Sequence, residues 1–289
     1  MRKVSKSDTF SKIYLMLVEN NYKRLERWIE DHQSKGKLSF SLNEIRNSFK
    51  QDSETAIKQL LERLTSIQKI VSVFKGYYII IPPQYSAKGI LPPSMFIDGL
   101  MKFLNRNYYV GLLNAAALHG ASHQQPQESF VVTEYPVMRP TNKKGIKINY
   151  ISTKQMPHEI LIEKRKTETG YINVSNPILT AIDLVNFEKK IGGLNRATAI
   201  IDELAESIHP KDINETLINY ASVTSMQRLG YILDEILNKS ALAEKINTKC
   251  KKAGKTFYLI PLKASGKKQK EHINEKWKIM INTEIEVYV

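Results

Sequence analysis

Residues 39–81 read SFSLNEIRNSFKQDSETAIKQLLERLTSIQKIVSVFKGYYIII, and this stretch decides the fold of the amino-terminal part of the chain. Its first apolar residues recur at helical spacing, which predicts a short amphipathic helix over residues 42–49. A second helix follows, with Asp52 or Ser53 placed to accept hydrogen bonds from its first free N–H groups. Its predicted buried face comprises Ala56, Ile57, Leu60, Leu61, Leu64 and Ile67.

The hydrophobic period then changes from that of a helix to that of a strand. Apolar runs at 70–73 and 77–81 flank Lys75 and Gly76, which predicts a β-hairpin with its turn at the glycine. We expect a short strand around Phe40 to pair with this hairpin. Two helices followed by a hairpin are the order of a winged helix-turn-helix, whose second helix enters the major groove of DNA. Winged helices also bind proteins, so a structural adaptor is an open alternative.

We expect the outer face of the second helix to contact DNA. The predicted DNA-binding residues are Ser53, Thr55, Lys58, Gln59 and Arg63 on the helix and Lys75 at the hairpin turn. Thr55, Lys58 and Gln59 lie early on the exposed face, where base edges or phosphates would be met. Arg63 is at least a turn further on, which favours a phosphate contact.

The charge balance points to the same class of partner. The chain has 43 Lys and Arg against 29 Asp and Glu, a formal net charge of +14, which favours a polyanion and nucleic acid first. Residues 1–84 contain 15 basic and 9 acidic residues, and residues 245–278 contain 11 Lys and 2 Glu. The sequence leaves open whether this second, lysine-rich segment contacts DNA phosphates, contacts an acidic protein or only faces solvent.

The cysteine count and the hydropathy of the sequence indicate the cellular compartment in which we expect the protein. Cys250 is the only cysteine, so neither an intrachain disulfide nor a cysteine-based zinc site forms within one chain. This composition fits a reducing cytoplasm. No run approaches the length of a membrane span and no signal-peptide pattern is present, so we expect a cytoplasmic protein.

Paired prolines mark the predicted domain boundary. Pro82-Pro83 and Pro92-Pro93 bracket a linker-like segment that resists helix continuation, which places the boundary near residue 85. The predicted domains are therefore a winged-helix DNA-binding domain over residues 1–84 and a larger domain over residues 85–289. A helical pattern over residues 8–33 is expected to pack behind the second helix, after a basic arm at residues 1–7.

The larger domain has the pattern of a mixed α/β domain with a small sheet and several helices, so the overall fold class is α+β. A helix over residues 95–105 is expected to bury Phe96, Leu100, Phe103 and Leu104. Ser175 or Asn176 is placed to cap a helix that starts at Pro177. Other predicted helices cover residues 112–119, 194–208, 211–220, 224–237 and 241–252. Predicted strands cover 108–110, SFVVTE, IKINYIS, EILIEK, GYINV, 257–262 and 277–289.

No catalytic motif stands out. His119 and His123 are four residues apart, but Gly120 breaks the helix between them, which disfavours a shared metal. Glu159 and Glu163 suggest a nuclease-like carboxylate cluster, and such a site needs a further carboxylate to hold Mg²⁺. We therefore expect no enzyme, no cofactor and no metal. The alternative is a metal-dependent nuclease or DNA-modifying enzyme with a winged-helix targeting domain.

Three blocks resemble the AbiEi family, the antitoxins of type IV abortive-infection toxin–antitoxin systems. Lys75-Gly76-Tyr77-Tyr78-Ile79 is similar to the family's wing strand. YYVGLLNAAALHGASHQQPQ at 108–127 is similar to its most specific block. VSNPILTAIDLVNF at 174–187 and MQRLGYILDEI at 226–236 are similar to its later helical blocks. The resemblance runs from about residue 38 to 240.

The resemblance implies a function that periodicity and charge do not give. It implies an amino-terminal domain that binds inverted repeats in operator DNA and represses its own operon. It also implies a carboxy-terminal antitoxin domain that counteracts a nucleotidyltransferase-like toxin, with or without a direct complex, and thus a role in phage defence.

Overall fold

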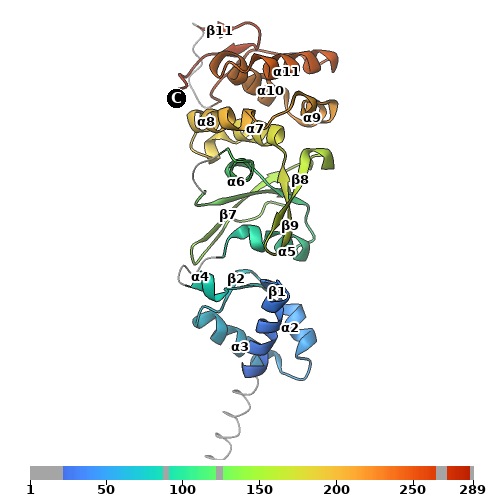
Figure 1. Ribbon diagram of the computed structural model, residues 1–289, viewed down its shortest axis with the longest axis vertical. Coiled ribbons are helices and arrows are strands. Elements are labelled where there is room, and N and C mark those ends of the chain that lie inside the picture. Colours follow the sequence, from blue (N-terminus) through green and yellow to red (C-terminus); the bar gives the residue numbers. More distant parts are fainter. Residues whose placement is uncertain (1–21, 87–90, 122–125, 265–271, 287–289) are drawn as a thin grey trace, which may run out of the picture. The chain divides into compact units, whose positions relative to one another are not determined.

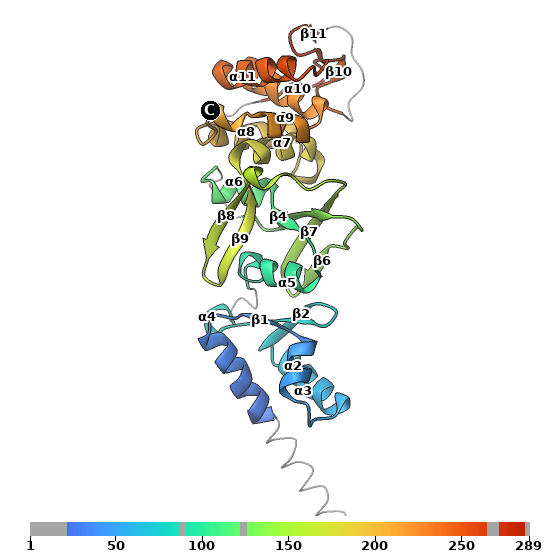
Figure 2. The same ribbon diagram turned by 90° about the vertical axis from the view of Figure 1, so that its right-hand side faces the viewer.

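A computed structural model describes residues 22–86, 91–121, 126–264 and 272–286. The chain divides into two compact units. The first comprises Met1–Arg106, Pro140–Ile148 and Lys166–Ile172, and the second comprises Asn107–Arg139, Asn149–Arg165 and Asn173–Val289. Helices and three sheets are present, so the mixed α/β class expected from the sequence is confirmed (Figures 1 and 2). The predicted arm at residues 1–7 and the start of the predicted first helix lie outside the described residues.

The first unit begins with helical residues 22–34, followed by β1 (Ser39–Ser41), α2 (Leu42–Ser48), α3 (Glu54–Ser66), β2 (Ile70–Phe74) and β3 (Tyr77–Ile80). The three strands form an antiparallel sheet in the order β1-β3-β2, with Phe40 opposite Tyr78. The short strand expected around Phe40 is thus found beside the hairpin. Ser41 caps α2 reciprocally with Glu44, a capping box that fixes where the helix starts.

A single apolar cluster holds these elements together. Leu25 and Ile29 of the first helical segment pack with Phe40, Ile45 and the inner face of α3. Burying such side chains stabilises a fold by about 1.5–3 kcal/mol each. The position of the first helical segment behind α2 and α3 therefore agrees with the predicted three-helix arrangement.

Two expectations around the predicted linker are corrected. α4 (Pro83–Ser86) is a short helix that starts within the proline pair, because proline is tolerated at the first helical position. The predicted helix over 95–105 is a 3₁₀ turn, η1 (Pro93–Met95), followed by α5 (Ile97–Phe103). Phe103, the last residue of α5, is 38% exposed rather than buried, and its ring lies 5.2 Å from the Tyr77 ring between centroids.

A six-stranded mixed sheet has the order β6-β7-β5-β4-β9-β8. Its strands are β4 (Tyr108–Val110), β5 (Ser129–Glu134), β6 (Thr141–Lys143), β7 (Ile146–Thr153), β8 (Ile162–Thr167) and β9 (Gly170–Ser175). β4 runs antiparallel to β5 and parallel to β9. The predicted strand EILIEK is partly wrong, since Glu159–Leu161 forms the 3₁₀ turn η2 before β8 begins.

The helices from α6 onward belong to the second unit. They are α6 (Leu112–Leu118), α7 (Pro177–Asn186), α8 (Leu194–Ala205), α9 (Glu215–Tyr220), α10 (Val223–Tyr231) and α11 (Ser240–Lys252), with 3₁₀ turns η3 (Glu188–Lys190) and η4 (Pro210–Asp212). A π-helical turn, η5 (Ile232–Ile236), continues α10. Asn176 caps α7, as one of the two predicted capping residues, and Pro177 occupies its first turn. Gly120 follows α6 with φ 83°, the backbone of a helix stop.

The two long strands expected at the end of the chain are not formed. Instead, β10 (Ile260–Pro261), β11 (Ile273–Asn274) and β12 (Ile279–Met280) are two-residue strands in the order β10-β12-β11. Trp277, just before β12, is fully buried against Gly230 of α10. Packing of this ring, rather than a long sheet, holds the terminal segment on the helices.

Candidate nucleic-acid interface

Helix α3 starts where the sequence predicts. The Ser53 side chain accepts a hydrogen bond from the Ala56 backbone N–H at 3.2 Å, so Ser53 is the cap. Asp52, the other candidate, instead pairs with Arg24 at 2.8 Å. Glu54 adds a negative charge in the first turn, which the helix dipole favours.

The inner face of α3 is the predicted aliphatic stripe except at its two ends, where Ala56 is only half-buried and Ile67 is exposed. Ile57, Leu60, Leu61 and Leu64 are buried, and Leu64 has no exposed surface. Ile67 is 49% exposed, so its predicted burial is wrong. Ile67 is the residue after the last helical turn, and the helical period no longer directs its side chain inward.

The predicted DNA-binding residues are all exposed, but they do not form one cluster. Thr55 and Lys58 line a groove of about 800 Å³ beside α3. The Arg63 guanidinium instead lies over the Tyr22 ring, 4.0 Å from its centroid. The structure thus brings Thr55 and Lys58 together and directs Arg63 toward the first helical segment.

Lys75 sits at the exposed hairpin turn, where Gly76 has φ 76°. The Gly76 carbonyl accepts a hydrogen bond from the Leu42 N–H at 2.8 Å, which ties this turn to the start of α2. Lys75 does not line the groove beside α3. If both contact DNA, Lys75 and Lys58 therefore meet it at separate points.

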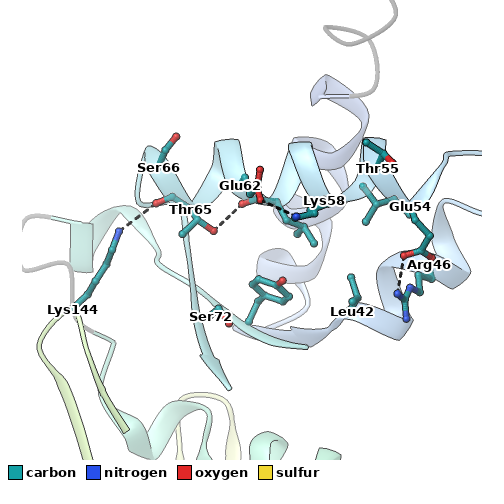
Figure 3. A pocket seen from close by; sticks show the side chains of 13 residues that line it. Leu42, Arg46, Glu54, Thr55, Lys58, Glu62, Thr65, Ser66, Ser72 and Lys144 are labelled. Carbon is teal, nitrogen blue, oxygen red and sulfur yellow. Dashed lines mark hydrogen bonds and ion pairs between the residues drawn. The ribbon is translucent and has the colours of Figure 1, made fainter. Parts of the chain in front are cut away.

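Carboxylates accompany several cations near α3. Arg46 pairs with Glu54 at 2.7 Å, and Lys58 lies 3.8 Å from Glu62 (Figure 3). These side chains are exposed, and exposed pairs contribute only about 0–1 kcal/mol. A phosphate can therefore compete for either cation at small cost.

The groove contains residues that the sequence analysis missed. Ser72 and Tyr78 of the hairpin, Arg46 of α2 and Lys144 of the β6–β7 turn line it together with α3. The Lys144 Nζ donates a hydrogen bond to the Thr65 carbonyl at 3.3 Å, between residues far apart in the sequence (Figure 3). The lysines of the loop RPTNKKG were the available signal, but the sequence does not show which helix they approach.

Two of the histidine and glutamate candidates, His119 and Glu163, have structural partners. The Arg165 guanidinium donates to His119 Nδ1 at 2.8 Å, and His119 Nε2 donates to the Ser175 carbonyl at 2.7 Å. Burial lowers the pKa of His119, and the hydrogen bond to the Ser175 carbonyl and the Glu163 charge act in the opposite direction. Glu163 pairs with Arg165 at 2.9 Å. His123 lies outside the described residues, and within the described part of the chain no three His, Cys, Asp or Glu side chains gather into a metal site.

The lysine-rich segment 245–278 is only partly described. Lys276 pairs with Asp234 at 2.7 Å and with Glu244 at 3.3 Å, and Lys278 pairs with Glu275. These pairs lie beside the buried Trp277, whose indole N–H donates to Asp234 at 2.9 Å. Part of this segment's charge therefore holds the chain end on α10 and α11.

Comparisons with known proteins found a family model and a solved structure that are similar to this chain. The family model described as the AbiEi antitoxin C-terminal domain matches residues 109–235. The crystal structure of the RV2827C protein from Mycobacterium tuberculosis is similar over 88% of this chain and 89% of its own, with a TM-score of 0.59 and 12% identity. At that identity the similarity shows a shared fold. No sequence among the curated proteins matches the chain.

The described helices include none that is both long and apolar enough to span a membrane. The match begins at the second residue of the YYVGLL block and ends within the MQRLGYILDEI block, the same blocks that resemble the family by sequence. The resemblance is thereby confirmed over this stretch. Residues 109–235 of the chain match the family model of the AbiEi antitoxin C-terminal domain.

Proposed function

We propose that this protein is the antitoxin of a type IV toxin–antitoxin system and also represses its own operon by binding operator DNA. The antitoxin role is supported by the AbiEi C-terminal domain match over residues 109–235. The proposed toxin is nucleotidyltransferase-like, as the family resemblance implies, and the direct complex is left open. On this proposal the protein acts in the cytoplasm, in phage defence, without catalysing a reaction.

We propose a division of labour between residues 1–84, which bind DNA as a winged helix, and residues 85–289, which act on the toxin. The matched antitoxin domain lies wholly within the second range. The first range contains the helices and the three-stranded sheet in winged-helix order. This division assigns one activity to each of the two ranges.

The DNA-binding proposal rests on the exposed face of α3. Thr55, Lys58 and Gln59 are exposed on a helix whose other side is anchored by Ile57 and Leu61. A rigid helix that presents polar and cationic side chains near its amino terminus is the form that enters a major groove. The net charge of +14 favours the encounter with a polyanion.

Separate deletions test the division. In cells that express the toxin encoded next to this gene, residues 85–289 should restore growth and should no longer repress a promoter reporter. Residues 1–84 should not restore growth. Rescue by residues 1–84 alone would show that the division is wrong. A neighbouring reading frame without any nucleotidyltransferase-like motif would contradict the proposed toxin.

A further inference from the structure

The β6–β7 hairpin carries a basic tip that the predicted DNA-binding residues do not include. Residues 142–147 read NKKGIK, three lysines without an acid. Lys143 pairs in register with Ile146, which leaves Lys144 and Gly145 as the two turn residues. Lys143 and Lys144 are both exposed. The hairpin therefore presents two adjacent positive charges at its end.

This tip lies beside α3. The Lys144 Nζ donates to the Thr65 carbonyl in the last turn of the helix, and Lys144 lines the same groove as Thr55 and Lys58 (Figure 3). Arg46 and Lys58 in that groove have carboxylates beside them, at 2.7 and 3.8 Å. Lys144 makes no ion pair with any residue that the structure describes. It is thus the groove cation that is most available to an external anion.

The backbone of Lys144 is unfavourable for a lysine. Its φ is 46°, in the left-handed region that glycine and asparagine adopt far more readily. A lysine at this position of the turn therefore has an unfavourable backbone conformational energy, and an asparagine would make that energy less unfavourable. The two-residue hairpin turn itself requires this backbone conformation, whatever the side chain does.

A purely structural role for Lys144 is the competing explanation. A lysine near the end of a helix can bind a terminal carbonyl and interact favourably with the helix dipole. The bond to Thr65 is long, at 3.3 Å, and uses one of three ammonium N–H groups of an exposed side chain. The hydrogen bond to Thr65 does not involve Lys143. Helix capping therefore explains the contact of Lys144, and it does not explain why a second lysine stands beside it.

We propose that Lys143 and Lys144 bind the phosphate backbone of duplex DNA next to α3, as a second basic hairpin in addition to the turn at Lys75. This inference rests on the proposed DNA-binding function of α3. The phosphodiester strand beside the major groove would pass the end of α3, where Lys144 and the hydroxyl-bearing Ser66 line the groove. Phosphate contacts of this kind position a protein without reading sequence.

The test uses the full chain with Lys143→Gln and Lys144→Asn together, and a labelled duplex from the promoter of its own operon. Two lost phosphate contacts should weaken binding by about tenfold or more and reduce the salt slope by about two units. A non-specific duplex should lose affinity by the same factor. The thermal midpoint should stay equal or rise, because asparagine suits the left-handed turn.

Lys189→Gln with Lys190→Asn is the matched control, since both are adjacent exposed lysines of η3, outside the lysine-rich segment, and the net charge falls equally. Unchanged affinity and slope in the hairpin variant would overturn the inference, as would an equal loss in the control. If Lys58→Ala weakens binding while the hairpin variant does not, the hairpin assignment fails and the proposed function stands. An unmodified chain that binds neither duplex would overturn both.

Discussion

Gly99 of α5 lies directly against the hydroxyl group of Tyr77 on β3, so closely that a Cβ atom at position 99 would overlap the phenol oxygen. Tyr77 is buried, and its hydroxyl donates to the Ser39 side chain at 2.6 Å. α5 is therefore packed on the sheet of the first unit, although it follows the predicted domain boundary in the sequence.

Gly99→Ala should destabilise the first unit by about 1–3 kcal/mol, the usual cost of overpacking a well-filled site. Tyr77→Phe removes the obstructing oxygen, so the double variant should lose less than the sum of the two single changes. Urea unfolding followed by circular dichroism measures these free energies. Strict additivity would contradict the close contact.

Ser53 caps α3 and is also a predicted DNA contact, and two substitutions separate these roles. Ser53→Ala should lower stability by about 1 kcal/mol, because the Ala56 N–H loses its acceptor. Ser53→Asp should keep the cap but weaken DNA binding, since a carboxylate repels a nearby phosphate. Unfolding and DNA titration are measured on both variants. If Ser53→Asp binds DNA like the unmodified chain, Ser53 lies away from the phosphates.

Asp183 is a buried carboxyl in the second unit, where it accepts a hydrogen bond from the Tyr109 hydroxyl at 2.9 Å. Burial raises its pKa to about 7, with the Tyr109 hydrogen bond acting in the opposite direction. The folded state therefore holds this proton more tightly than the unfolded state does. Stability is favoured at low pH and falls as the pH rises from about 4 to about 7.

Asp183→Asn keeps an acceptor for Tyr109 and removes this titration. Relative to the unmodified chain, the variant should gain at least about 1 kcal/mol between pH 5 and pH 7.5. Denaturant unfolding at the two pH values measures the change. A stability difference that does not vary with pH would show that Asp183 is ionised throughout this range.

Gly230 makes room for Trp277. A Cβ atom at position 230 would meet the indole ring, which is fully buried and holds the chain end on α10. Gly230→Ala should therefore cost about 1–3 kcal/mol and expose the terminal segment to proteolysis. Adding Trp277→Phe shortens the ring system and should recover part of the loss. A Gly230→Ala protein as stable as the unmodified chain would contradict this packing.

Local features of the fold could be predicted from the sequence. The Ser53 cap, the Ile57–Leu64 stripe and the Gly76 turn each depend on residues only a few positions apart. The errors at Ile67 and Phe103 both lie at helix ends, since Ile67 follows the last turn of α3 and Phe103 is the last residue of α5. The match to the AbiEi domain confirms the resemblance that the motif blocks carried.

Long-range relationships could not be predicted in the same way. The approach of Lys144 to Thr65 and the packing of Trp277 on Gly230 join residues that no periodic pattern connects. Asp183 did carry a signal, as a carboxylate within the apolar run ILTAIDLV, but its partner Tyr109 lies in another block. The six DNA-binding residues stay predictions. Lys144, which lines the groove beside α3, is a further residue whose substitution tests DNA binding.

The most direct test of the central claim is a salt titration of DNA binding by the unmodified chain, Lys58→Ala and Lys75→Ala, with Lys211→Ala as an exposed control. The unmodified chain should bind its promoter duplex, with the logarithm of the affinity falling linearly with the logarithm of the salt concentration. Each of the first two substitutions should weaken binding to any duplex and reduce the slope by about one unit, and the control should not. Equal affinity and equal slope for all four proteins would contradict a DNA interface on α3 and the hairpin turn.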